Sequence, residues 1–264
     1  MPVSLDEKVT ALRRELSEST SLIIAYSGGV DSTCLLAIAV QELGDAALGV
    51  IADSPSLPRE ALREALAVAH AMGARVEVVK TTEFDQADYL ANPPNRCYFC
   101  KAELFRQLEN LAQRRKVKAI AYGENADDVA ATRPGSRAAA EFRILAPLRS
   151  AGLTKNDVRE LSRRLNLPTA DAPAQPCLSS RVPHGTPVTV AALHLVERGE
   201  AVLRDLGFRV FRVRFVPGAV PSALIQVAHE EMSRLPGCLK VIRQALQGLG
   251  FATVEVDPNG YRAG

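Results

Sequence analysis

Short apolar runs alternate with longer amphipathic segments along the first 150 residues of the chain. The apolar runs predict strands, because they are five or six residues long and rich in Ile, Val, Leu and Ala. We expect them at 22–26, 48–52, 75–80 and 117–122. Segments with helical periodicity follow at 32–43, 59–72 and 101–115. Strands separated by single helices predict an α/β fold, a parallel sheet with helices on both faces.

A proline-rich stretch then interrupts this alternation. Five prolines lie between residues 168 and 187, and proline cannot continue a helix, so we interpret the stretch as an irregular functional loop. The later pattern of helix, two strands, helix and strand predicts a small C-terminal α+β domain. We expect these elements at 188–206, 209–215, 223–228, 230–249 and 251–256. The sequence therefore predicts one domain at 1–185 and a second at 186–264.

Composition and charge exclude several classes of protein. The chain has 264 residues, 47% of them hydrophobic, which argues against disorder. The 32 basic and 30 acidic residues give a net charge of +2, too balanced to favour a nucleic-acid partner. Apolar runs are too short to cross a membrane, and the N-terminal segment has no secretory pattern. We therefore expect a cytoplasmic protein without a membrane or nucleic-acid partner.

A glycine-rich loop lies between the first predicted strand and its helix. Gly28 and Gly29 allow the backbone to approach an anion, and Ser27 and Ser32 add hydroxyl groups beside the helix N-terminus. A carboxylate within such a loop, Asp31, is explained by a bound Mg²⁺. The spacing matches neither the Walker loop nor the dinucleotide fingerprint. The pattern predicts nucleotide binding, with a capped strand–helix turn as the alternative.

Further polar residues follow other predicted strands. Asp53 ends the second strand, and Gly123 to Asp128 follow the fourth. Because the carboxyl ends of parallel strands share one edge of a sheet, we expect these residues beside the loop, with Asp53 and Gly123 at the ATP site. Asp127 and Asp128 are expected either to bind Mg²⁺ or to cap the segment that follows.

The five cysteines indicate thiol or metal chemistry rather than a disulfide framework. Cys97 and Cys100 form a C-x-x-C pair, which suits a metal, an iron–sulfur cluster or a dithiol but cannot complete a tetrahedral site. Cys177 lies in a loop braced by prolines, where the nearby Arg181 favours the thiolate. Cys34 and Cys238 fall on apolar helix faces and are interpreted as small buried hydrophobes.

Two resemblances add to these observations. The loop at 26–32, Y-S-G-G-V-D-S, resembles that of the PP-loop ATP pyrophosphatases, whose sheet is of the adenine nucleotide alpha hydrolase type. The loop and the segments 133–135, 153–159 and 177–185 together resemble the LarE family, and this resemblance covers essentially the whole chain. That family makes the sulfur groups of the nickel-pincer nucleotide cofactor of lactate racemase and related enzymes.

The LarE resemblance implies a reaction. ATP would adenylate a carboxylate of pyridinium-3,5-biscarboxylic acid mononucleotide, and a sulfur nucleophile would then displace AMP to leave a thiocarboxylate. In one branch of the family the residue matching Cys177 gives up its own sulfur. In another branch three cysteines hold a [4Fe–4S] cluster, and Cys97, Cys100 and Cys177 match that pattern. The resemblance also implies ATP with Mg²⁺, a small nucleotide substrate and a homo-oligomer, a hexamer in relatives.

The resemblance assigns further residues. Arg212 and Arg214 alternate along a predicted strand and share one face, and they are expected to bind the substrate phosphate, with a solvated strand face as the alternative. Glu200 matches an acidic position near the reactive cysteine, with an exposed helix glutamate as the alternative. Asp128 and Arg133 are expected near the substrate. One departure is the segment 215–227, which lacks charged residues common in relatives at 215–218 and 223–226, so substrate or subunit contacts there are open.

Three other functions remain open on the sequence. A PP-loop tRNA thiolase would also use three cysteines, but it calls for a basic surface or zinc-ribbon ends. An amide-forming ligase of the NAD or GMP synthetase type would use ammonia and leave the three cysteines unexplained. A non-enzymatic adenine-nucleotide sensor would leave Asp31 and the Cys177 loop unexplained.

Overall fold

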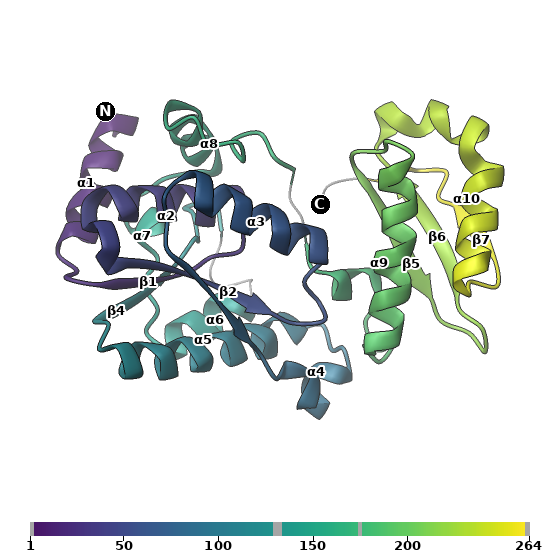
Figure 1. The fold of residues 1–264 in the computed structure, drawn as a ribbon, viewed down its shortest axis with the longest axis horizontal. Coiled ribbons are helices and arrows are strands. Elements are labelled where there is room, and N and C mark those ends of the chain that lie inside the picture. Colours follow the sequence, from purple (N-terminus) through teal and green to yellow (C-terminus); the bar gives the residue numbers. More distant parts are fainter. Residues whose placement is uncertain (1–2, 129–133, 174–175, 262–264) are drawn as a thin grey trace. The chain divides into compact units, whose positions relative to one another are not determined.

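The computed structural model of the chain describes residues 3–128, 134–173 and 176–261. Packing divides the chain into two compact units (Figure 1). The first comprises residues 1–83 and 95–172, and the second comprises residues 84–94 and 173–264. The segment 84–94 thus belongs with the C-terminal part of the chain. The sequence-based boundary after residue 185 stays a prediction.

The first unit contains a four-stranded parallel sheet, as predicted. Its strands are β1 (Leu22–Ala25), β2 (Ala47–Asp53), β3 (Val76–Lys80) and β4 (Ala119–Tyr122), in the spatial order β3-β2-β1-β4. In β1, one of the two inner strands, Ile23 is in register with Leu48 of β2 and Ile120 of β4. Because all four strands run in one direction, their carboxyl ends form a single edge.

Helices cover both faces of this sheet. They are α1 (Leu5–Ser17), α2 (Val30–Leu43), α3 (Arg59–Ala71), α5 (Arg96–Arg115), α6 (Pro134–Glu141), α7 (Pro147–Ser150) and α8 (Lys155–Arg164), with a short 3-10 turn at Gly44–Ala46. Leu22 and Ile24 join the core beneath α1, α2 and α8, whereas Ile23 joins the core beneath α5. This alternation follows from the two-residue period of a strand. Helix α5 begins at Arg96 rather than near residue 101, so it includes the C-x-x-C pair.

The second unit packs two helices on a small mixed sheet. Its elements are α4 (Ala87–Leu90), α9 (Val190–Asp205), β5 (Phe211–Val216), β6 (Ser222–Val227), α10 (Leu235–Leu249) and β7 (Val254–Val256), with 3-10 turns at Leu178–Arg181 and His229–Arg234. A further 3-10 turn, Glu83–Asp85, lies where the chain enters this unit. The sheet order is β5-β6-β7, antiparallel and then parallel. Helix α10 starts at Leu235 rather than near 230, because the preceding residues form a 3-10 turn and a proline occupies its first turn.

The core of the second unit is built from both helices and all three strands, with Val213, Ile225 and Ile242 fully buried. Throughout the ranges that the structure describes, no helix is long and apolar enough to cross a lipid bilayer.

Candidate functional site

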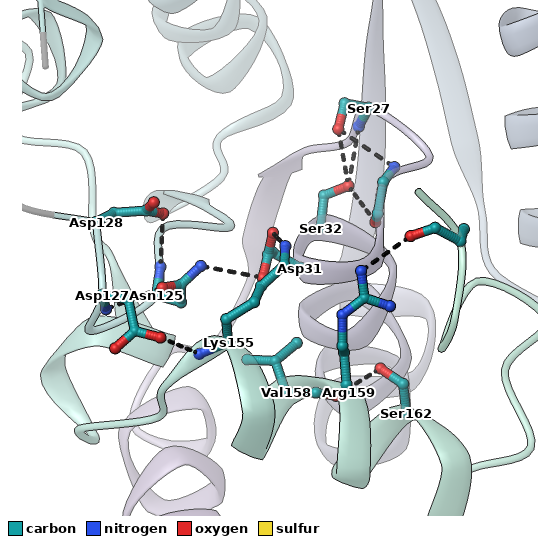
Figure 2. Close-up of polar contacts among 12 residues, drawn as sticks. Ser27, Asp31, Ser32, Asn125, Asp127, Asp128, Lys155, Val158, Arg159 and Ser162 are labelled. Atoms are coloured by element: carbon teal, nitrogen blue, oxygen red, sulfur yellow. Dashed lines mark hydrogen bonds and ion pairs between the residues drawn. The ribbon is translucent and has the colours of Figure 1, made fainter. Parts of the chain in front are cut away.

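The glycine-rich loop lies at the carboxyl edge of the first sheet, between β1 and α2. The Ser32 hydroxyl is 3.2 Å from the backbone N of Ser27 and 3.1 Å from its Oγ, and it donates to the Gly29 carbonyl at 3.1 Å (Figure 2). Gly29 is the N-cap of α2 and provides no side-chain cap. The first amides of a 14-residue helix are therefore available to an anion such as a phosphate.

Two glycines are required by close packing at this edge. Gly28 has φ +77°, and a Cβ on it would lie 2.6 Å from Cβ of Ala65 in α3. A Cβ on Gly123, after β4, would lie 2.7 Å from the backbone N of Ser32. Because backbone cannot move aside as a flexible side chain can, Gly123 sets how closely the loop after β4 approaches the nucleotide loop.

Asp31 is the centre of a polar network from three elements. Its Oδ2 is 2.5 Å from Nζ of Lys155, the first residue of α8, and its Oδ1 accepts from Asn125 Nδ2 at 3.2 Å (Figure 2). The backbone N of Lys155 donates to Asp127 Oδ2 at 2.8 Å. Asp128 Oδ2 accepts from the backbone N of Asn125 at 3.2 Å. The structure thus brings together the residues expected after β1 and β4.

This network suits a magnesium ion that is shared with a nucleotide. Mg²⁺ is bound by oxygen ligands, commonly one or two carboxylates completed by water and substrate phosphates. Asp31, Asp127 and Asp128 supply such oxygens, although no group of three or more His, Cys, Asp or Glu residues forms a metal site among the described residues. Asp31 therefore fits as a carboxylate ligand, with ATP completing the site.

Asn125 lies in the stretch 123–128 that was expected beside the loop, and Lys155 lies in the segment 153–159 that resembles the family, but neither residue was expected to have a role in the site. Lys155 is placed by the capping box of α8, in which the Thr154 side chain and Asp157 bond each other's backbone N. A T-x-x-D pattern before a predicted helix is a local signal for that cap. The pairing of Lys155 with Asp31, 124 residues away, has no local signal.

Asp53 lies at the expected edge, at the end of β2, but its carboxylate is engaged. Its Oδ1 is 2.6 Å from NH1 of Arg59, at the start of α3, and Arg59 also donates to the Ser54 carbonyl at 2.8 Å. This ion pair braces the connection from β2 to α3. A role of Asp53 in ATP binding stays a prediction.

The C-x-x-C pair lies in the first turns of α5. Cys97 is exposed and Cys100 is half-buried, and their spacing places both thiols on one helix face. The next residue, Lys101, places its ammonium 4.5 Å from the ring centre of Tyr122, at the end of β4. Burial lowers the pKa of Lys101, and the carboxylate of Glu124 opposes that shift. Sequence reasoning missed Lys101, whose one signal was a basic residue directly after the motif.

The Cys177 loop of the second unit is held by a buried ion pair. Arg181 is 4% exposed, and its Nε and NH2 bond the two carboxylate oxygens of Glu200 at 2.8 and 3.1 Å. Its NH1 donates to the carbonyls of Pro176 at 2.5 Å and Cys177 at 3.0 Å. Glu200 also accepts from the backbone N of Val213 at 3.2 Å. Arg181 thus fixes the backbone of Cys177, and the alternative of an exposed glutamate at position 200 is wrong.

Two further arginines share one face of β5. Arg212 donates to the hydroxyl of Tyr261 at 3.0 Å, and its guanidinium lies 4.5 Å from the centre of that ring. Arg214 donates to Gln226 at 2.8 Å and to the Ser180 carbonyl at 2.6 Å. The strand face next to the Cys177 loop is therefore basic and ordered, rather than a solvated surface.

Positive charge is in excess around this face. Among the described residues, these three arginines, Arg181, Arg212 and Arg214, lie near two carboxylates: the buried Glu200, which pairs with Arg181, and the half-buried Asp257, whose charge interacts with that of Arg214. Burial lowers the pKa of Arg212, and the neighbouring Arg181 guanidinium lowers it further. A phosphate would relieve this excess, because guanidinium groups bind phosphate oxygens in pairs.

The structure places only two of the three cysteines expected to act together in the same unit. Cys97 and Cys100 belong to the first unit and Cys177 to the second, and none of the three forms a disulfide. Their chemistry fits an iron–sulfur cluster, because all three are thiols, but a three-cysteine site stays a prediction. Arg133, expected at the substrate, lies outside the described residues.

Comparisons with known proteins extend over both units. A family model described as NAD synthase matches residues 5–131. A protein of Synechocystis sp. is 41% identical over 264 residues, 98% of this chain and 97% of its own. A pyridinium-3,5-bisthiocarboxylic acid mononucleotide synthase of Lactiplantibacillus plantarum is 31% identical over 263 residues, 99% and 94% of the two chains. A glutamine-hydrolysing GMP synthase of Methanopyrus kandleri has a subunit that is 25% identical over 182 residues, 62% and 55% of the two chains.

Proposed function

Because the chain belongs to the LarE family, we propose that it converts a carboxylate of pyridinium-3,5-biscarboxylic acid mononucleotide to a thiocarboxylate. The chain is an ATP-dependent, adenylating sulfurtransferase with a PP-loop domain. The observation that carries the proposal is that one chain has both a nucleotide loop with Asp31 in its first unit and, in its second unit, the Cys177 loop beside three arginines.

Adenylation is assigned to the first unit. A substrate carboxylate oxygen attacks the α-phosphorus of ATP, the bond from that phosphorus to the bridging oxygen breaks, and pyrophosphate leaves. The loop 27–32 and the N-terminus of α2 bind phosphate oxygens, and Asp31 holds the Mg²⁺ that accompanies ATP. Lys155, which lies 2.5 Å from Asp31, adds a positive charge where negative charge develops.

Sulfur transfer is assigned to the Cys177 loop. If Cys177 is the donor, its thiolate attacks the acyl carbon, the bond to AMP breaks and a thioester forms. Loss of the Cys177 α-proton to a base and cleavage of its Cβ–S bond then release the thiocarboxylate and leave dehydroalanine. In the alternative that we favour, Cys97, Cys100 and Cys177 would hold a [4Fe–4S] cluster, which would supply sulfide as the sulfur donor in place of the Cys177 thiol. In both cases Arg181 orients the loop through the Cys177 carbonyl.

Substrate binding is assigned to the basic face of β5. Arg212 and Arg214 would hold the phosphate of the mononucleotide, supported by their shared face and by the excess of positive charge. Asp128 and Arg133 stay candidates for substrate binding by the family resemblance alone, and Arg133 lies outside the described residues. The expected homo-oligomer, a hexamer by analogy, is checked by light scattering on the purified protein.

Separate assays of the two steps test this function. Pyrophosphate release reports adenylation, and mass spectrometry of the product reports thiocarboxylate. We expect Cys177→Ala to keep pyrophosphate release and to lose thiocarboxylate, and Asp31→Asn to lower both by at least ~100-fold, since it removes charge stabilisation. Cys238→Ala, in α10, is the matched cysteine control and should match wild type. Equal loss of both products in Cys177→Ala would contradict the assigned role.

Iron and acid-labile sulfide, measured after purification without oxygen, decide the source of sulfur. About four irons per chain, lost in Cys97→Ala, Cys100→Ala and Cys177→Ala, would support the cluster. No iron after reconstitution would leave Cys177 as the sacrificial donor. Ammonia offered in place of a sulfur source tests the ligase alternative, which predicts an amide product.

A further inference from the structure

A cavity of about 580 Å³ lies in the first unit, at the amino end of β4. Its walls are the last turns of α5, the connection 116–118, the first two residues of β4 and the stretch 142–145 after α6 (Figure 1). Because the strands are parallel, the nucleotide loop lies at the opposite edge of the sheet. The proposed reaction therefore uses none of the residues that line this cavity. A volume of this size is typical of sites that bind small organic molecules.

Apolar side chains line much of the cavity. Val117, Phe142 and Leu145 are among them, and Leu145 is 38% exposed. The backbone beneath them is fixed, because the N of Leu145 donates to the Ile120 carbonyl and its carbonyl accepts from the N of Tyr122, both at 2.9 Å. The cavity thus offers ordered apolar surface to a ligand.

The same cavity carries an excess of positive charge. Lys116, Lys118 and Arg143 line it together with one carboxylate, that of Glu109. The three cations are exposed, and none of these four groups forms an ion pair with another residue that the structure describes. The charge that the cavity favours in a ligand is therefore negative.

Two of these cations occupy backbone positions that favour glycine. Lys116 ends α5 with φ 56°, and Arg143 follows α6 with φ 53°. In each case the backbone N of the next residue donates to a carbonyl five positions back, as in a Schellman motif. A left-handed conformation crowds the Cβ atom, so a lysine or an arginine at this position costs stability.

Other helices of the chain that end in this motif use residues that tolerate it. In α3, α9, α10 and α8, the left-handed position is held by Gly73, Gly207, Gly250 and Asn166. Among the described residues, Lys116 and Arg143 are the two with positive φ that are neither glycine nor asparagine, and both line the one cavity. The dipole of α5 does not require Lys116, because Arg114 and Arg115 already lie in its last turn.

We propose that this cavity binds an amphipathic organic anion, a carboxylate or a phosphate ester on an apolar body. Lys116, Lys118 and Arg143 surround the charged group, and the apolar side chains contact the body. The two strained backbones place long cationic side chains at the cavity, where glycine would offer no charge, and ligand binding accounts for that strain. The site is separate from the nucleotide and substrate sites of the proposed function.

The test follows binding of anilinonaphthalene sulfonate to the full-length chain without ATP. This aromatic anion becomes more fluorescent in apolar surroundings. We expect saturable binding in wild type, and at least ~10-fold weaker binding in Lys116→Gly and in Arg143→Gly, because each variant loses a charged donor. Lys118→Met, which keeps the aliphatic stem, should also weaken binding.

Two matched controls separate the cavity from general effects. Asn166→Gly makes the same backbone change at the end of α8, and Arg114→Met removes an exposed cation of α5 that does not line the cavity. Both should bind the probe within about 2-fold of wild type. The urea midpoints of Lys116→Gly and Arg143→Gly should equal or exceed that of wild type, because glycine relieves the left-handed strain. Weaker binding by a chain of equal or higher stability does not come from unfolding.

Displacement of the probe identifies the class of anion. Octanoate or phenyl phosphate should displace it at a lower concentration than inorganic phosphate, which lacks an apolar body, and the better of the two shows whether that body is aliphatic or aromatic. Absence of saturable binding, equal affinity in wild type and both glycine variants, or equal displacement by inorganic phosphate would overturn the inference. Urea midpoints below wild type in both glycine variants would also overturn it, since the two cations would then serve the helix ends.

Discussion

The buried pair of Arg181 and Glu200 gives a prediction that can be worked from the structure. The two side chains are 4% and 6% exposed and are joined by two bonds. Replacing Glu200 by Ala leaves Arg181 buried without its counter-ion and leaves the backbone N of Val213 without its acceptor. Loss of one partner of a buried pair costs about 3–5 kcal/mol. For the second unit, which comprises residues 84–94 and 173–264, that cost corresponds to a decrease in Tm of at least ~12 °C.

The assay is urea unfolding followed by circular dichroism, with calorimetry for Tm. Glu230→Ala, at an exposed glutamate in the same unit, should change stability by less than ~0.5 kcal/mol. The double variant Arg181→Met/Glu200→Leu removes both charges, so it should cost less than the sum of its single changes by at least ~2 kcal/mol. A cost below ~1 kcal/mol for Glu200→Ala, or additive single changes, would refute the reasoning.

Three further predictions address the first unit, and the first of them has its comparison variant in the second unit. Gly123→Ala should weaken ATP binding at least ~10-fold, measured by calorimetry, because the new Cβ would lie 2.7 Å from the backbone N of Ser32. By comparison, Gly248→Ala should stabilise the chain by about 0.5–1 kcal/mol, because Gly248 lies on α10 with open space around it. Burial raises the pKa of Cys34 from 9.0 to about 12, so its contribution to stability is complete below pH 9 and is lost as pH rises from 9 to 12. In that window, wild type should lose up to ~1.4 kcal/mol per pH unit more than Cys34→Ala in urea unfolding, and equal slopes would contradict the assignment. Burial lowers the pKa of Lys101, which means that its charged form is disfavoured in the folded chain. Lys101→Met should therefore raise the midpoint of urea unfolding, while thiocarboxylate formation falls. A lower midpoint would show instead that the charge of Lys101 stabilises the fold.

Much of the fold could be predicted from the sequence because local patterns determine it. The runs expected at 22–26 and 48–52 correspond to β1 and β2, and their alternating residues pack on opposite faces of the sheet. The predicted start of α5 was late, because the turn carrying the C-x-x-C pair mixes polar and aromatic residues and lacks apolar periodicity. The membership of 84–94 in the second unit was not predicted, since it depends on hydrogen bonds to residues about 90 positions away.

Some residues of the candidate site could likewise be predicted from local sequence, and others could not. The loop 27–32 and Gly123 were predictable, because a phosphate loop and a close backbone approach each require particular residues at fixed local positions. The roles of Lys155 and Asn125 were not predictable, because a lysine and an asparagine fit many surroundings and their bonds to Asp31 join residues 124 and 94 positions apart. Glu200 lies between these cases, since its position on a helix suggested exposure while its burial depends on Arg181. The residues hardest to predict are therefore those that connect one motif to another, as Lys155 connects α8 to the nucleotide loop.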